Sequence, residues 1–303
     1  MTIRFDKKKK IISAVCIVIA VAVAAALIIN NVISSKPASL ADAGLQLTDE
    51  ITLISHRGMN LLAPENSLEA ADKTAGYSYT HIEFDIRQTK DGVWVLMHDE
   101  DIKRTTDGKG KVSELTYKQV VGCNIDKNCK EYDKVKIPSL DEMLSRCGTL
   151  GLHPVIEIKQ SGTECIEELM NFLGHRTSEC TIIAFNREQV ELISKLMKEA
   201  TTSLTSARVE LYWLTSDLSD ETLETAKTNT SIGVSFNGNK AGKPEEIKKF
   251  TDAGIKLATW TIDKSARLAE LYSLGVTTFT TNKITPDGIF NDPAQEVTTN
   301  ARG

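Results

Sequence analysis

Charged and imidazole side chains gather at four points of the sequence, each at the end of a stretch typical of a buried strand. The four clusters are His56-Arg57-Gly58, Glu83-Phe84-Asp85, His98-Asp99 and Glu157-Ile158-Lys159. Carboxylates bind hard divalent cations, which together with arginine and lysine neutralise a phosphate. Histidines transfer protons near neutral pH. This set of residue types therefore indicates metal-assisted cleavage of a phosphodiester.

The first thirty-odd residues differ in kind from the rest. Residues 1–10 form a basic tail, and residues 11–29 are nineteen residues without a charge. This length is sufficient for a transmembrane anchor and exceeds most signal-peptide cores. The lysines before it predict a cytoplasmic N-terminus and a single-pass protein of the cell membrane, with its catalytic domain extracellular. A signal peptide cleaved near Ala41-Asp42-Ala43 is the alternative, and it would make the protein secreted.

The rest of the chain is acidic. Residues 30–48 have the small and polar residues of a linker, and residues 49–303 have the length of one (β/α)₈ barrel domain. The formal charge of the chain is −5, of which residues 1–36 contribute six basic residues and one acid, so the remainder carries −10. We therefore expect no nucleic-acid partner. An anionic phosphate would also be repelled unless a cation lay between.

The cysteines leave two interpretations open. Cys16 lies in the apolar segment, and five more follow it: Cys123, Cys129, Cys147, Cys165 and Cys180. Outside the membrane they could form disulfides, and the short loop between the first two would allow a local bridge. Buried thiols are the other interpretation.

Apolar and β-branched runs alternate with helical patterns along the domain. Strands are expected at Ile51–Ser55, His81–Thr89, Pro154–Lys159, Thr181–Phe185, Val209–Leu214, Ile232–Phe236, Lys256–Ile262 and Thr277–Thr281, with helices between them, for example at Arg187–Glu199 and Ser265–Leu274. Eight strands in such a series predict an α/β fold, a (β/α)₈ TIM barrel, rather than a doubly wound open sheet.

The alternation of side chains along a strand predicts that the acids face the inside of the barrel. Side chains alternate along a strand, so Glu83 and Asp85 share one face, as do Glu157 and Lys159. Charges on the inner face of a buried strand are costly unless they are paired or bound to a metal. Because chemistry in such barrels occurs at the C-terminal ends of the strands, these residues are expected to meet at one mouth.

Two local signals concern the loops around this mouth. Lys90-Asp91-Gly92 predicts a tight turn after which Val93–His98 returns as a hairpin strand. Asn66 is expected to cap a helix over Ser67–Gly76. Glu65 could reach the mouth of the site or favour the N-terminus of that helix electrostatically, and we favour the second interpretation.

These ordered motifs resemble those of the glycerophosphodiester phosphodiesterase family. The resemblance runs through His56-Arg57-Gly58, Pro64-Glu65-Asn66-Ser67, Glu83-x-Asp85 with Thr89-Lys90-Asp91-Gly92, Met97-His98-Asp99, Arg104-Thr105-Thr106-Asp107-Gly108 and Glu157-Ile158-Lys159. It implies a (β/α)₈ barrel that hydrolyses glycerophosphodiesters to glycerol 3-phosphate and an alcohol. It also implies a divalent metal as cofactor, Mg²⁺ or Ca²⁺.

The resemblance further implies a role for each site residue. Glu83, Asp85 and Glu157 look like the metal ligands, His56 and His98 like the acid–base pair, Arg57 and Lys159 like phosphate contacts, and Trp260 like a wall of the substrate site.

The chain departs from the family pattern at two positions. Ala184 precedes Phe185 where a serine is common, and Asn282 follows Thr281 where an aspartate is common. An asparagine there resembles the related sphingomyelinase D branch, which leaves the substrate head group open. Glycerophosphodiesters or lysolipids are thus the expected substrates. A lysophospholipase D or sphingomyelinase D-like reaction that forms a cyclic phosphate, or a non-catalytic surface binding protein, are the alternatives.

Overall fold

The chain divides into two compact units, 1–37 and 38–303, and the fold described below belongs to the second. The computed structural model describes residues 37–46, 50–125, 129, 131–177, 179–199, 208–229 and 231–287. The predicted basic tail and apolar anchor lie outside these residues. Among the helices that the structure describes, none is long and apolar enough to span a bilayer.

Eight parallel strands close into a barrel. They are β2 (Thr52–Ser55), β3 (His81–Gln88), β5 (His153–Ile158), β6 (Glu179–Ala184), β7 (Arg208–Thr215), β8 (Gly233–Asn237), β9 (Leu257–Trp260) and β10 (Thr278–Thr281). Each strand pairs with the next along the chain, and β2 pairs with both β3 and β10, which closes the ring. This closure confirms the predicted barrel and excludes the open doubly wound sheet.

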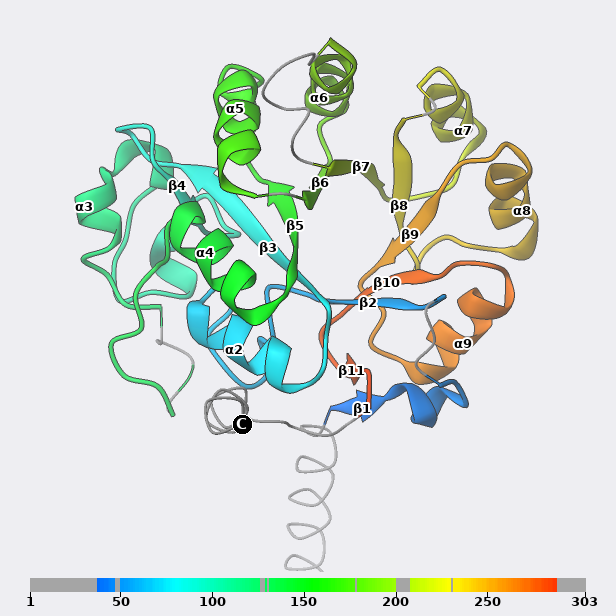
Figure 1. Ribbon diagram of the computed structural model, residues 1–303, viewed down its shortest axis with the longest axis horizontal. Coiled ribbons are helices and arrows are strands. Elements are labelled where there is room, and N and C mark those ends of the chain that lie inside the picture. Colours follow the sequence, from blue (N-terminus) through cyan, green and yellow to red (C-terminus); the bar gives the residue numbers. More distant parts are fainter. Residues whose placement is uncertain are drawn as a thin grey trace, which may run out of the picture. The chain divides into compact units, whose positions relative to one another are not determined.

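Helices surround the strands (Figure 1). They are α2 (Leu68–Gly76), α4 (Leu140–Leu150), α5 (Ile166–Arg176), α6 (Arg187–Glu199), α7 (Asp220–Lys227), α8 (Pro244–Asp252) and α9 (Ser265–Ser273). Their apolar faces pack on the outward side chains of the strands, for example Val190 and Ile193 of α6. Inside the barrel a smaller apolar cluster that includes Val155, Ile183 and Tyr212 fills the space below the mouth.

A hairpin carries the second histidine back to the barrel. β4 (Trp94–Leu96) pairs antiparallel with the end of β3, as the turn signal predicts. The amide of Met97 donates to the carbonyl of Asp85 at 3.0 Å, and this bond sets the following residue, His98, beside β3. The segment from β4 to α4, with η2 (Ile102–Arg104), η3 (Val112–Glu114) and α3 (Tyr117–Val120), packs around a small core of its own.

The predicted linker is in part a folded element. β1 (Ala38–Ser39) pairs parallel with β11 (Ile284–Thr285), and η1 (Leu40–Ala43) follows. Leu40 is 0% exposed and belongs to the core on the outer side of the barrel. The folded unit thus begins at Ala38 rather than at residue 49. Small and polar residues are typical of linkers, but their composition does not reveal a pairing partner at the other end of the domain.

For three of the cysteines, Cys147, Cys165 and Cys180, the structure supports the interpretation as buried thiols. Cys123 has a free thiol, so the local bridge that its spacing to Cys129 allowed is not formed between these described residues. Cys147 and Cys180 are buried, and burial raises the pKa of each thiol to about 12. Such thiols are inert and serve as packing groups.

Candidate active site

The predicted carboxylates meet at the mouth of the barrel. Asp85 of β3 and Glu157 of β5 are direct partners in the parallel register, and Glu83 lies two residues before Asp85 on the same strand face. The three side chains offer oxygen atoms that all lie within 4.8 Å of one another. They are at most 6% exposed. A cluster of acids this deeply buried requires compensating positive charge.

Part of that compensation is missing among the protein groups. Glu83 Oε1, Asp85 Oδ1 and Glu157 Oε1 are buried, and no residue that the structure describes donates a well-directed hydrogen bond to them. An unsatisfied buried polar atom costs about 1–3 kcal/mol, and more when it is charged. No described residue donates to Glu83 Oε1, whereas Lys159 Nζ lies close to the other two oxygens. An all-oxygen set of this kind fits a hard divalent cation such as Mg²⁺ or Ca²⁺.

Two basic side chains border the acids. Lys159 Nζ lies 2.5 Å from Glu157 Oε1 and 3.4 Å from Asp85 Oδ1. Arg57 Nε lies 3.4 Å from Asp85 Oδ2. The three carboxylates outnumber these two cations. When all three carboxylates are ionised and no metal ion is bound, the cluster therefore repels an anionic phosphate.

The protonation of the acids reflects this crowding. Burial, together with the neighbouring Asp85, raises the pKa of Glu83 well above its ordinary value and that of Glu157 to about 7. Burial would also raise the pKa of Asp85, but Lys159 and Arg57 hold it below its ordinary value. These shifts favour protons on the two glutamates, and such protons relieve part of the repulsion among the acids.

A sharp turn after β2 connects the first histidine to the acids. Arg57 and Gly58 both have left-handed backbone, with φ of 57° and 71°. This conformation directs the amide of Arg57 to Glu83 Oε2 at 2.8 Å and the amide of Gly58 to the carbonyl of Glu83 at 3.1 Å. A Cβ at Gly58 would lie 2.7 Å from Ala70 Cβ of α2. The turn therefore requires glycine for both conformation and space.

The variant Gly58→Ala should be less stable than a conformationally matched control. Gly44 has the same φ of 71°, and a Cβ at that position would meet nothing within 4 Å, so Gly44→Ala should cost only the backbone strain, about 1–2 kcal/mol. Gly58→Ala should add about 1–3 kcal/mol of overpacking against α2. Urea denaturation of both variants measures the difference, and equal losses would show that the contact with Ala70 relaxes freely.

His56 lies between the acids and the end of β10. Its Nδ1 is 2.8 Å from Asn282 Oδ1, and its Nε2 is 3.9 Å from Glu83 Oε2. Burial and the charge of Arg57 lower the pKa of His56, which favours a neutral imidazole.

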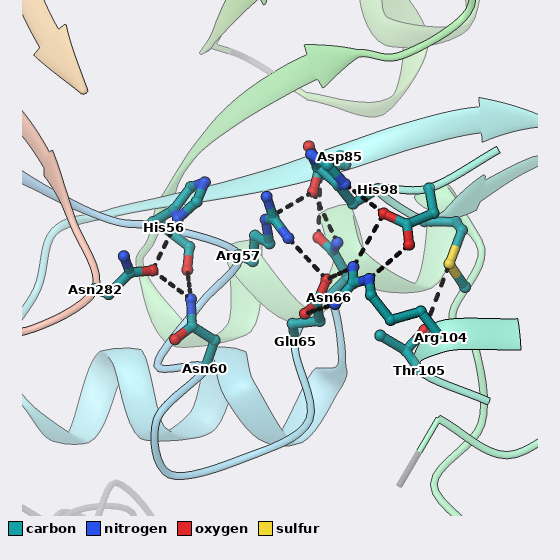
Figure 2. A network of polar contacts seen from close by, with 12 residues as sticks. His56, Arg57, Asn60, Glu65, Asn66, Asp85, His98, Arg104, Thr105 and Asn282 are labelled. Atoms are coloured by element: carbon teal, nitrogen blue, oxygen red, sulfur yellow. Dashed lines mark hydrogen bonds and ion pairs between the residues drawn. The ribbon is translucent and has the colours of Figure 1, made fainter. Parts of the chain in front are cut away.

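His98 is held by a chain of charged groups (Figure 2). Its Nδ1 is 2.7 Å from Asp99 Oδ1, and Arg104 donates to both Asp99 and Glu65. Glu65 also accepts from Arg57 Nη1 at 3.0 Å. We expected Glu65 to act on the helix N-terminus, but it instead joins the two histidine-bearing loops. Burial lowers the pKa of His98, while Asp85 and Asp99 oppose this effect.

Asn66 has a role that the sequence did not reveal. Ser67, not Asn66, caps α2, because the amide of Ala70 donates to Ser67 Oγ at 3.0 Å. Asn66 has a φ of 59° and exchanges two hydrogen bonds with Asp85: Asn66 Nδ2 donates to Oδ2 at 2.9 Å, and the Asp85 amide donates to Asn66 Oδ1 at 3.0 Å. Asn66 and Ser67 are adjacent, and both residue types favour the N-cap of a helix. The sequence therefore did not show which of the two caps α2.

Arg87 is a second residue that our interpretation of the sequence missed. It donates through Nε and Nη2 to the carbonyl of His98, at 3.1 and 3.0 Å, and through Nη1 to the carbonyl of Lys159 at 2.8 Å. It thereby fixes the hairpin loop against the end of β5. Strand parity could have found Arg87, since it follows Glu83 and Asp85 on the same face of β3.

An aromatic corner forms one side of the mouth. Trp260 donates through Nε1 to the carbonyl of Ser235 at 3.1 Å, and its ring meets that of Phe185 edge-on, with centroids 5.4 Å apart. Phe185 is 46% exposed, and Lys159 Nζ lies 5.8 Å from the centre of its ring. Phe185 thus lies between Trp260 and the basic Lys159.

Comparison with known proteins identifies the chain as a phosphoric diester hydrolase. Residues 56–285 match the glycerophosphoryl diester phosphodiesterase family, and the chain belongs to that family.

Its relatives include curated enzymes and solved barrels. Glycerophosphodiester phosphodiesterase 1 of Homo sapiens is 27% identical over 252 residues, covering 75% of this chain and 76% of that protein. A glycerophosphodiester phosphodiesterase of Bacillus subtilis is also 27% identical, over 81% of this chain and 88% of its own. The fold is that of an Oleispira antarctica phosphodiesterase solved with the product sn-glycerol-3-phosphate (TM-score 0.70, 19% identity, 83% of this chain and 97% of that one).

Proposed function

We propose that this chain hydrolyses glycerophosphodiesters to glycerol 3-phosphate and an alcohol, with a divalent cation held by Glu83, Asp85 and Glu157. The observation that carries this proposal is the cluster of three buried carboxylates, whose oxygen atoms lie within 4.8 Å of one another and in which Glu83 Oε1 receives no hydrogen bond from a described residue. A cation bound there supplies stabilisation of the charge that develops on the phosphoryl oxygens.

Arg57 and Lys159 would contact the non-bridging oxygens of the phosphate. Both are paired with carboxylates, Arg57 with Glu65 and Asp85, and Lys159 with Glu157 and Asp85. Their positive charge is therefore partly neutralised, and phosphate affinity should depend on the cation. The acidic character of the whole domain adds to this dependence.

The surroundings of the two histidines differ in a way that suggests their roles. The Nδ1 atom of His56 contacts the neutral amide of Asn282, whereas the Nδ1 atom of His98 contacts the carboxylate of Asp99. A carboxylate stabilises imidazolium, so His98 is the better proton donor to the leaving alkoxide. His56 would then accept the proton of the attacking hydroxyl. If the neighbouring glycerol hydroxyl attacks first, the two roles exchange when water opens the cyclic phosphate.

The function is tested by release of glycerol 3-phosphate from glycerophosphocholine with and without excess chelator. We expect the chelator to abolish release and added Mg²⁺ or Ca²⁺ to restore it. Full activity in excess chelator would contradict the cation-dependent mechanism. Binding of substrate without turnover under all conditions would support the non-catalytic alternative.

A second reaction is favoured by the aromatic corner, in which Phe185 is exposed and packs edge-on against the partly buried Trp260. An apolar surface beside Lys159 can accommodate the chain of a lysolipid, whose cleavage by its own hydroxyl would give a cyclic phosphate. Phosphorus NMR of the products distinguishes the two reactions, because the cyclic and open phosphates give separate signals.

We also propose that residues 11–29 anchor the enzyme in the cell membrane with its catalytic domain outside. The basic tail and the length of the apolar run support this orientation. Cleavage after Ala43 would remove β1 and the buried Leu40, which argues against a signal peptide ending there. Recovery of the full chain in the soluble fraction of lysed cells would exclude the anchor.

A further inference from the structure

We propose that Asp263 and Asn282 are positioning residues that keep the ring proton of His56 on Nδ1 and so leave Nε2 free to accept a proton. This inference deepens the proposed function, because it rests on the role of His56 as the proton acceptor. It concerns Asp263, which follows β9, and Asn282, which follows β10.

Asp263 fixes the orientation of the Asn282 amide. Its Oδ1 accepts the backbone amide of Asn282 at 2.7 Å, and its Oδ2 accepts Asn282 Nδ2 at 2.9 Å. An ionised carboxylate can only accept hydrogen bonds, so the NH₂ group of Asn282 must face Asp263. The amide oxygen, Asn282 Oδ1, therefore points the other way, to His56 Nδ1 at 2.8 Å.

Asn60 requires the same orientation independently (Figure 2). Its Nδ2 donates to the backbone carbonyl of His56 at 2.7 Å and to Asn282 Oδ1 at 2.7 Å. The carbonyl is an acceptor only, so the Asn60 amide cannot be reversed without losing this bond. Two contacts from different loops thus make Asn282 Oδ1 an acceptor toward His56.

The protonation site of the neutral imidazole follows from these contacts. Nδ1 of His56 must carry the proton, since its partner oxygen has none to give. Nε2 then carries the lone pair, and it lies on the side of the carboxylate cluster, 3.9 Å from Glu83 Oε2. The opposite tautomer would place N–H where the proton of the attacking hydroxyl has to go.

The variant Asp263→Asn should break this arrangement. Its side-chain oxygen would still accept the Asn282 backbone amide, but its NH₂ group would face the NH₂ group of Asn282. Rotation of the Asn282 amide removes that conflict at the cost of its bond from Asn60 Nδ2, which keeps the His56 carbonyl as an acceptor. The rotation turns a donor toward His56 Nδ1, which moves the ring proton to Nε2. We expect kcat to fall by roughly 10²–10⁴-fold, the usual contribution of general acid–base catalysis, with KM little changed.

A reciprocal exchange provides the rescue. In the double variant Asp263→Asn/Asn282→Asp, the new NH₂ group at position 263 can donate to the new carboxylate at position 282, which can still accept from His56 Nδ1 and from Asn60. Every donor keeps an acceptor, so the double variant should recover the wild-type tautomer and most of the lost kcat. Asp107→Asn is the matched control, because Asp107 accepts the same two bonds from Asn124, at 2.8 Å each.

The direct readout is nitrogen NMR of the full chain labelled in its five histidine rings. For His56 at a pH where the ring is neutral, we expect a protonated-type signal at Nδ1 and a lone-pair-type signal at Nε2 in the wild type, the Asp107→Asn control and the double variant. A reversed or mixed pattern is expected only in Asp263→Asn. A wild-type ring protonated on Nε2, or an unchanged pattern in Asp263→Asn, would overturn the inference.

The two proposals can fail separately. An inactive protein whose His56 shows the Nδ1–H pattern would contradict the proposed hydrolysis and leave the positioning role intact. An active protein whose His56 lacks the Nδ1–H pattern would support the proposed hydrolysis and contradict the positioning role of Asp263 and Asn282.

Discussion

Replacing Glu83 by glutamine should lower glycerol 3-phosphate release by about 10²–10³-fold, or about 3–4 kcal/mol, without destabilising the cation-free protein. Burial and the neighbouring acids raise the pKa of Glu83 well above its ordinary value, which favours the neutral carboxyl group. Glutamine has the same shape and charge, and its oxygen can still accept the amide of Arg57. What it cannot do is ionise to hold a divalent cation.

The measurement is the rise in melting temperature on adding Mg²⁺ or Ca²⁺, together with the rate of product release. Both should be present in the wild type and in the exposed control Glu114→Gln, and both should be lost in Glu83→Gln. A variant that kept the full cation-induced rise would show that Glu83 is not a ligand.

The same acids predict how the cation effect depends on pH. The pKa of Glu157 is about 7 in the folded protein, against an ordinary value of 4.5. A folded pKa above the unfolded one gives stability that is complete below the unfolded pKa and is lost as the pH rises through the folded pKa. The cation-free protein should therefore lose this contribution between about pH 4.5 and 7. A bound cation takes the place of the proton, so its stabilising effect should grow over the same interval.

The barrel was predictable because its signals are local. Each strand is a short apolar or β-branched run, and strand parity alone placed Glu83 beside Asp85 on the inner face. The hairpin that returns His98 also followed from a local turn signal, Lys90-Asp91-Gly92.

The contacts that orient the site were not predictable, because they join distant parts of the chain. Arg104 and Glu65 are 39 residues apart, and Asn282 and His56 are 226 residues apart. Neither hydrophobic periodicity nor a turn signal predicts which loops of a closed barrel lie next to one another. The same limit applies to Leu40, whose burial depends on strands from the other end of the domain. The residue types of the proposed metal ligands can thus be predicted from the ends of the strands. The partners that orient them can be identified only in the folded structure.

Replacing His98 by alanine should affect substrates according to their leaving groups. Hydrolysis of glycerophosphocholine should fall by roughly 10²–10⁴-fold, because a choline alkoxide needs a proton to leave. Hydrolysis of a p-nitrophenyl phosphodiester should fall far less, since nitrophenolate leaves without one. The variant should fold, because Arg104 continues to hold Asp99, whose pKa is about 2, and Arg87 binds the backbone carbonyl at position 98.

His56→Ala is the matched comparison for this prediction. If His56 accepts the proton of the attacking hydroxyl, its loss should slow both substrates by similar factors, since attack precedes departure of either leaving group. The ratio of the two rates in each variant is independent of how much enzyme is active, which makes it a direct measure of the role of each histidine. A leaving-group effect in His56→Ala and not in His98→Ala would reverse the assignment. In that case the carboxylate of Asp99 would be activating a base rather than stabilising an acid.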